Sequence, residues 1–247
     1  MSRPSPVNTN TMAKLASWIT QCSFALLASR CLVCGERGSA TRDLCPACAA
    51  ALPWNRRACD RCGLPLPGSD ALCGACLLTP PPFAQTRAAF IYAAPVDRLL
   101  PRFKFHGDLA AGALLAELMA SRLLDAERPQ ALVPVPLHRQ RLRQRGYDQA
   151  LELAKGLAAA LDLPIIGDVL RRVGATAAQS ELDASARQRN VRGAFTCRRD
   201  ALPAHVALVD DVMTTGATVR ECALTLRCAG VARVDVWAVA RAPQERS

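Results

Sequence analysis

Apolar positions from about residue 83 onward follow two alternating periods. Short apolar runs typical of buried strands lie at 86–93, 131–135, 206–211 and 231–241, with a further run at 165–173. Apolar residues at helical spacing predict helices over 109–126, 147–161 and 217–230. Strands that alternate with helices indicate an α/β domain with a mainly parallel sheet and helices on both of its faces.

The uncharged run from Leu15 to Ser29 is too short for a membrane span of about 20 residues, and Ser17 and Thr20 interrupt it. The same polar residues argue against a signal peptide. We therefore expect a cytoplasmic protein with no membrane span, a short amphipathic helix here and disorder over residues 1–11. Met12 is an alternative start.

Eight of the twelve cysteines form a repeat. Writing CLVCGERGSATRDLCPAC above CDRCGLPLPGSDALCGAC aligns four C-x-x-C pairs, which indicates two copies of one unit. A zinc ion takes four thiolates in a tetrahedron, and each C-x-x-C turn directs two sulfurs at one ion. One or two structural zinc ions are therefore expected, and spacing alone leaves open whether the two copies share ligands. The ligands are Cys31, Cys34, Cys45, Cys48, Cys59, Cys62, Cys73 and Cys76.

Two other uses of such cysteines are less consistent with the sequence. A disulfide framework is typical of exported proteins, and redox C-x-x-C pairs rarely occur four at a time. The run Pro80-Pro81-Pro82 cannot continue a helix or a central strand, so it marks a linker. We expect an N-terminal tail and short helix over 1–30, a double zinc ribbon over 31–79 and the α/β domain over 83–247.

The stretch ALVDDVMTTGATV places two acids, Asp210 and Asp211, at the end of a buried strand. Unpaired carboxylates are costly to bury, and ligands of parallel sheets bind beyond the carboxyl ends of the strands. The following turn, Thr214 to Thr218, offers hydroxyls and the amides of a helix start, and Gly216 allows close approach of an anion. The acids suit the hydroxyls of a sugar, because carboxylates accept hydrogen bonds from a vicinal diol. The pattern predicts a site for a sugar phosphate.

Other motifs of this type fit less well. A P-loop would have Lys after its glycine, whereas Ala217 follows Gly216, and the dinucleotide pattern G-x-G-x-x-G is absent from the sequence. A receiver domain would place most of its length after the acid pair, but only residues 212–247 follow. The alternative to a ligand site is an ordinary turn whose acids are exposed to solvent.

The stretch VALVDDVMTTGAT resembles the phosphoribosyl pyrophosphate (PRPP) motif of type I phosphoribosyltransferases. Together with the double zinc ribbon, three further segments resemble the ComF (GntX-like) family: FKFHGD (103–108), VPVPLHRQRLRQRGYDQ (133–149) and the R…T…Q…R..NV.GAF pattern over 172–195. The resemblance spans residues 31–241 and implies a type I phosphoribosyltransferase-like fold. Asp148 departs from the Asn that the family usually shows, and we expect it to form an ion pair with Arg145.

The resemblance also implies roles for individual residues. Asp210 and Asp211 would bind the ribose hydroxyls and form the catalytic pair, with Mg²⁺ on the pyrophosphate. A lid would contain Gln179, Arg187 and Asn190, and His106 is a further candidate phosphate contact. The remaining candidate PRPP ligands are Thr214, Thr215, Gly216, Ala217 and Thr218 for the 5′-phosphate, Val135, Pro136, His138 and Arg139 for the pyrophosphate loop, and Lys104, Arg145 and Arg187.

The charge balance suits a polyanionic partner, since 31 basic against 21 acidic side chains give +10. Phe103, Phe105 and Tyr147 lie within basic segments, a combination that favours binding of single-stranded DNA.

Two functions are consistent with these observations. One is a PRPP-dependent transferase that acts on a base or amine. The other is a ComF-type protein of DNA uptake or utilisation, whose pocket senses PRPP or contacts single-stranded DNA and which works with DNA-uptake proteins. We favour the ComF-type reading with PRPP binding, and the sequence leaves catalysis open.

Overall fold

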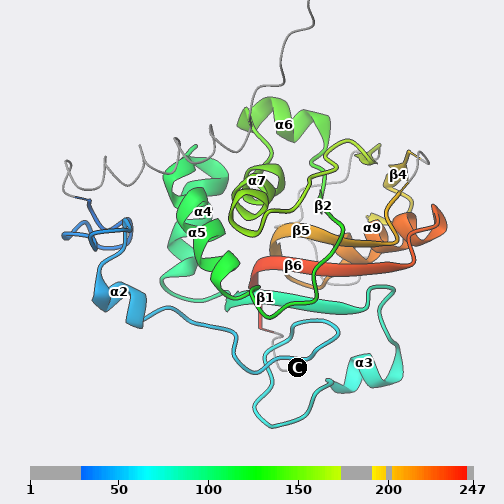
Figure 1. Cartoon of the computed structure of the whole chain (residues 1–247), viewed down its shortest axis with the longest axis horizontal. Coiled ribbons are helices and arrows are strands. Elements are labelled where there is room, and N and C mark those ends of the chain that lie inside the picture. Colours follow the sequence, from blue (N-terminus) through cyan, green and yellow to red (C-terminus); the bar gives the residue numbers. More distant parts are fainter. Residues whose placement is uncertain (1–28, 174–190, 199–201, 244–247) are drawn as a thin grey trace, which may run out of the picture. The chain divides into compact units, whose positions relative to one another are not determined.

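The computed structural model describes residues 29–173, 191–198 and 202–243. The chain forms two compact units, Met1–Ala51 and Leu52–Ser247. The first contains the first cysteine module with helix α2 (Pro46–Ala50), and the second contains the second module with helix α3 (Gly74–Leu78) and the sheet (Figure 1). The helix expected within 15–29 and the expected lid lie outside the described residues, apart from Ser29. The predicted domain boundaries stay a prediction.

The main sheet has four parallel strands in the order β1-β6-β5-β2 (Figure 1). Their apolar runs place β5 and β6 in the centre, where both faces of each strand are covered. The predicted mainly parallel α/β sheet is confirmed. The strands are β1 (Gln85–Ile91), β2 (Ala131–Pro134), β5 (His205–Met213) and β6 (Arg233–Arg241).

Helices pack on both faces of this sheet. Val206 and Leu208 of β5 share one hydrophobic core with Cys222 and Leu226 of α9 (Ala217–Cys228). Successive strand residues point to opposite faces, so the equally buried Val209 faces the other side. There α5 (Leu109–Ser121) and α7 (Gln149–Leu161) pack against each other and against the strands, next to α4 (Val96–Phe105).

Three local features differ from the sequence-based expectation. The strand predicted over 165–173 is divided: Ile165 forms an isolated bridge with Leu132, and β3 (Leu170–Arg172) pairs antiparallel with β4 (Phe195–Cys197). The helix predicted over 109–126 ends at Ser121 with Arg122 as its C-cap. Two helices after residue 83 were not predicted: α4, and α6 (Arg139–Arg145), which is formed by the basic run after His138 and has no apolar period.

The unequal lengths of the central strands create the site. Strand β2 ends at Pro134 opposite Val209, and Val135 adds one backbone hydrogen bond of 2.9 Å to the Val209 carbonyl. Strand β5 continues beside β6 as far as Met213. Asp210 and Asp211 therefore lie on the part of β5 that extends past β2. Within the part of the chain described, every helix is too short or too polar to cross a bilayer.

Candidate functional site

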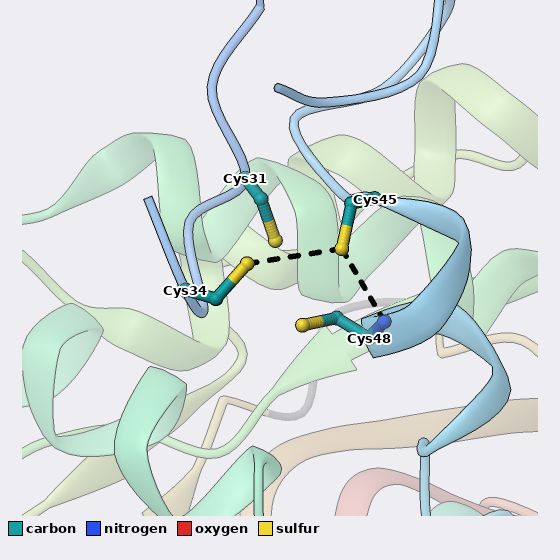
Figure 2. Close-up of side chains that lie close together, drawn as sticks. All are labelled: Cys31, Cys34, Cys45 and Cys48. Carbon is teal, nitrogen blue, oxygen red and sulfur yellow. Dashed lines mark hydrogen bonds between the residues drawn. The ribbon is translucent and has the colours of Figure 1, made fainter. Parts of the chain in front are cut away.

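The first four-cysteine cluster lies in the first compact unit. Figure 2 shows the sulfurs of Cys31, Cys34, Cys45 and Cys48 converging, with Cys34 and Cys45 Sγ 3.7 Å apart and the Cys48 amide donating to Cys45 Sγ over 3.4 Å. The four ligand atoms all lie within 4.8 Å of one another. A zinc tetrahedron with Zn–S bonds of about 2.3 Å has sulfur–sulfur edges of about 3.8 Å, so the cluster fits structural zinc.

The second cluster repeats this arrangement with Cys59, Cys62, Cys73 and Cys76, whose ligand atoms also lie within 4.8 Å of one another. Cys62 and Cys73 Sγ are 3.6 Å apart. Backbone hydrogen bonds bring the pKa of Cys59 down to about 7 against the effect of burial, whereas burial raises the pKa of Cys62 in the same cluster to about 11. Each repeat therefore supplies its own four ligands, and interleaved pairing is excluded.

A cavity of about 420 Å³ opens at the carboxyl ends of the strands. This volume is in the range of small-molecule sites. Residues of β5, α4, α6 and α7 and the loop between β5 and α9 surround it. Eleven of the predicted PRPP ligands line it: Lys104, Val135, Pro136, Arg145, Asp210, Asp211, Thr214, Thr215, Gly216, Ala217 and Thr218.

The acid pair is partly buried at the floor of this cavity. Asp210 Oδ1 accepts the Asp211 amide over 2.9 Å, and Lys104 Nζ lies 2.9 Å from Asp211 Oδ1. Burial raises the pKa of Asp210 to about 7, the charge of Asp211 acts in the same direction, and Lys104 opposes both. The two acids of the site therefore differ. Asp211 is paired with Lys104, whereas the pKa of Asp210 lies near 7.

The loop after β5 has the backbone shape that an anion site requires. Gly216 is the N-cap of α9 with φ 76°, and an added Cβ would lie 3.2 Å from Met213 Cε. Glycine has no side chain that could accept the first amides of α9, and the positive dipole end of this twelve-residue helix lines the cavity. Thr215 contributes its hydroxyl, which accepts the Ala217 amide over 3.3 Å.

Arg145 and Gln149 both line the cavity and are hydrogen-bonded to each other. Arg145 Nη1 donates to Gln149 Oε1 over 2.8 Å, and its guanidinium carbon lies 4.9 Å from the centre of the Phe105 ring, which is 64% exposed. Gln149 is 1% exposed, and its Nε2 has no hydrogen-bond partner among the described residues.

The expected ion pair between Asp148 and Arg145 is wrong. Asp148 is instead the N-cap of α7, where it accepts the amides of Ala150 and Leu151, and it also accepts the Leu137 amide over 3.2 Å. Arg145 uses Gln149 as its partner. The acid at this position therefore fixes the end of the loop after β2 against the start of α7.

Other predicted ligands lie elsewhere. His138 caps α6 through its Nδ1, and neither it nor Arg139 nor His106 lines the cavity. Arg187 lies outside the described residues. The cavity also contains Arg141, Arg172 and Gln149, which the site prediction missed. Arg172 begins the R…T…Q…R pattern; it is buried, and its guanidinium carbon lies 5.5 Å from the centre of the Phe195 ring.

Comparisons with known proteins identify relatives of this chain. The double zinc ribbon domain family matches residues 23–77. "Competence protein F" of Haemophilus influenzae is 39% identical over 160 residues, 61% of this chain and 70% of that protein. "DNA utilization protein YhgH" of Escherichia coli K12 is 34% identical over 222 residues, 85% of this chain and 89% of that protein.

Among solved structures, the match to the "Structure of the allosteric regulatory enzyme of purine biosynthesis" has 22% sequence identity and a TM-score of 0.36. It covers 52% of this chain and 25% of that enzyme's chain. This likeness is too weak to bear on function. This chain covers 70% of competence protein F, at 39% identity, and 89% of YhgH, at 34% identity. It therefore belongs to the ComF family, which includes both proteins.

Proposed function

We propose that this protein binds PRPP together with Mg²⁺ in the cavity at the end of β5. The observation that carries the proposal is the pairing of two acids with the start of helix α9 around one cavity. A phosphate alone would be repelled by the acids, and a sugar alone would not need the helix end. A sugar phosphate satisfies both parts at once.

Each part of the site has a separate task. Asp211, held by Lys104, accepts hydrogen bonds from the ribose diol, and Asp210 can either accept or donate because its pKa lies near neutrality. The Thr214 to Thr218 loop binds the 5′-phosphate. The loop after β2, with Val135 and Pro136, lies where the pyrophosphate would extend, and Arg145 supplies positive charge. Mg²⁺, when bound, neutralises the pyrophosphate charge.

Calorimetric titration of PRPP with Mg²⁺ tests this proposal. Asp211→Asn removes one charge that would face the diol and should weaken binding at least about tenfold, since hydrogen bonds to charged groups are the stronger ones. Asp168→Asn is the matched control, because Asp168 is an exposed acid paired with Arg198 and does not line the cavity. Equal affinity in both variants, or no binding by the zinc-loaded wild type, would contradict the proposal.

The biological setting that we propose is DNA uptake or utilisation in the cytoplasm, as the names of the relatives suggest. A DNA contact has its own support in the structure. Helix α6 has four arginines in seven residues, and Arg139 and Arg143 are exposed outside the cavity. Phe105 adds an exposed ring at the cavity rim for stacking against a base. DNA-uptake proteins are the expected macromolecular partners.

A salt titration with single-stranded DNA separates this contact from PRPP binding. The double variant Arg139→Ser with Arg143→Ser should reduce the slope of log K against log salt by about 1.4, because each phosphate contact in single strands contributes about 0.7. PRPP affinity should stay unchanged. Lys155→Ser, which removes an exposed lysine paired with Glu152, is the control. DNA affinity that is absent at low salt would exclude the nucleic-acid role.

If transfer from PRPP takes place, the protein's contribution is to hold the ribose and exclude water, since charge builds on the ribose and on the leaving pyrophosphate. The acceptor would enter beside Phe105 and Arg145, at the rim. Release of pyrophosphate in the presence of candidate bases or amines distinguishes a transferase from a PRPP sensor.

A further inference from the structure

Arg241, the last residue of β6, connects the second four-cysteine module to the loop after β5. Its side chain is buried, at 6% exposure. Nε donates to the Cys62 carbonyl over 3.0 Å, and Nη1 donates to the Met213 carbonyl over 3.0 Å and to the Thr214 carbonyl. One guanidinium therefore holds the backbone of a zinc-ligand turn and the first residue of the predicted phosphate loop.

The Cys59–Cys62 turn is firmly seated on the edge strand. Thr86 of β1 donates its hydroxyl to the Arg61 carbonyl over 2.7 Å and its amide to the Asp60 carbonyl over 2.9 Å. Gly63, at φ 68°, packs so closely that an added Cβ would lie 2.8 Å from Thr86 Cγ2. The position of the Cys62 carbonyl therefore depends on the shape of this turn.

Besides these hydrogen bonds, the second cysteine module has only a small apolar cluster to hold its shape. Its hydrophobic cluster consists of Cys59, Cys73 and Cys76, with Leu64, Leu66 and Leu72 against them. In modules of this size, metal binding supplies most of the folding free energy. A zinc ion with four thiolates also has a net formal charge of about −2, which complements a buried guanidinium whose hydrogen-bond partners among the described residues are all carbonyls.

We propose that Arg241 is a positioning residue for the Thr214 to Thr218 loop and that zinc in the second cluster, through Cys62, keeps it in place. Arg241 itself does not line the cavity. Its effect on a ligand is indirect, through the carbonyls of Met213 and Thr214, which precede Gly216 and the start of α9. The part of this inference that concerns a ligand rests on the proposed PRPP function, whereas the part that concerns loop order does not.

Hydrogen exchange of two amides beside the loop tests the coupling without any ligand. In Arg241→Met, which keeps most of the side-chain volume, the amides of Arg220 and Ala242, which donate to the Gly216 and Met213 carbonyls over 2.9 Å, should exchange at least about tenfold faster than in wild type, because several charge-assisted hydrogen bonds that hold the loop are lost. Arg241→Lys should restore part of the protection. Arg233→Met is the matched control, because Arg233 lies at the opposite end of the same strand and binds Asp235 and Glu127.

The two metal sites provide the second comparison. Cys59→Ser with Cys62→Ser should accelerate exchange of the same two amides, whereas Cys31→Ser with Cys34→Ser should leave it unchanged. Unchanged exchange of these amides in Arg241→Met, or an equal effect of both cysteine variants, would overturn the proposal. If these variants do not fold, Thr86→Val decides, since it loosens the turn while keeping all ligands: faster exchange of the two amides supports the coupling and unchanged exchange refutes it.

PRPP titrations with the same variants keep the two proposals separate. If wild type binds PRPP, Arg241→Met should bind it about tenfold more weakly with two zinc ions retained. If wild type binds no PRPP, the proposed function fails, and the exchange experiment still decides the role of Arg241.

Discussion

The raised pKa of Asp210 gives a prediction about stability and pH. Its folded-state pKa of about 7 lies above the ordinary 3.8, because burial and the charge of Asp211 disfavour its ionised form. Protonation of Asp210 therefore stabilises the folded state fully below about pH 3.8, and this contribution is lost as the pH rises through about 7. The whole effect amounts to at most about 4 kcal/mol, since one pKa unit corresponds to about 1.4 kcal/mol.

Asp210→Asn removes this dependence and should be more stable than wild type at alkaline pH. Between pH 6 and pH 8.5, the range that keeps zinc thiolates intact, the stability advantage of the variant should grow by about 1.4 kcal/mol. Urea denaturation of both proteins at the two pH values, with zinc present, measures the difference. A constant difference between variant and wild type would refute the reasoning, since it would mean that Asp210 titrates normally.

Three further predictions concern the loop, the rim and the metal sites. Gly216→Ala should lower the free energy of unfolding by about 1–2 kcal/mol, because φ 76° strains any other residue, and should also weaken PRPP binding. Gly230→Ala, at φ 105°, is the control and should lower only the stability. Denaturation measures the stability of both variants, and calorimetry measures PRPP binding. Gln149→Leu should leave the free energy of unfolding within about 1 kcal/mol of wild type, since the lost hydrogen bond is offset by removal of a buried donor that has no partner among the described residues. The same variant should weaken PRPP binding, because Arg145 loses its hydrogen-bond partner. Metal analysis of reduced protein should give about two zinc ions per chain and about one after Cys59→Ser with Cys62→Ser; a single ion in the wild type would contradict the two-site arrangement.

Local patterns were the predictable part of this molecule. The four C-x-x-C pairs predicted the eight metal ligands, because two cysteines three positions apart cannot lie far apart in space, whereas the grouping into two clusters came from the structure. The strand, turn and helix around Gly216 were also predictable, since an apolar run, a glycine and a helical period follow one another directly. The parallel sheet followed from the alternation of such segments.

Contacts between distant segments were not predictable in the same way. The ion pair between Lys104 and Asp211 depends on the packing of α4, which the apolar pattern does not predict. One local expectation also failed: Asp148 was expected to pair with Arg145, yet its carboxylate accepts the backbone amides of Ala150 and Leu151 at the start of α7. Nothing local to Arg241 indicates that its guanidinium reaches Cys62, 179 positions earlier in the chain.

The most direct test of the account is a crystal structure of the zinc-loaded protein grown with PRPP and Mg²⁺. We predict the 5′-phosphate against the amides of residues 214–218, the ribose hydroxyls at Asp210 and Asp211, and the pyrophosphate beside Val135 and Pro136. Bound PRPP at another place, or a cavity that stays free of ligand at saturating concentration, would contradict the central claim that the end of β5 is a sugar-phosphate site.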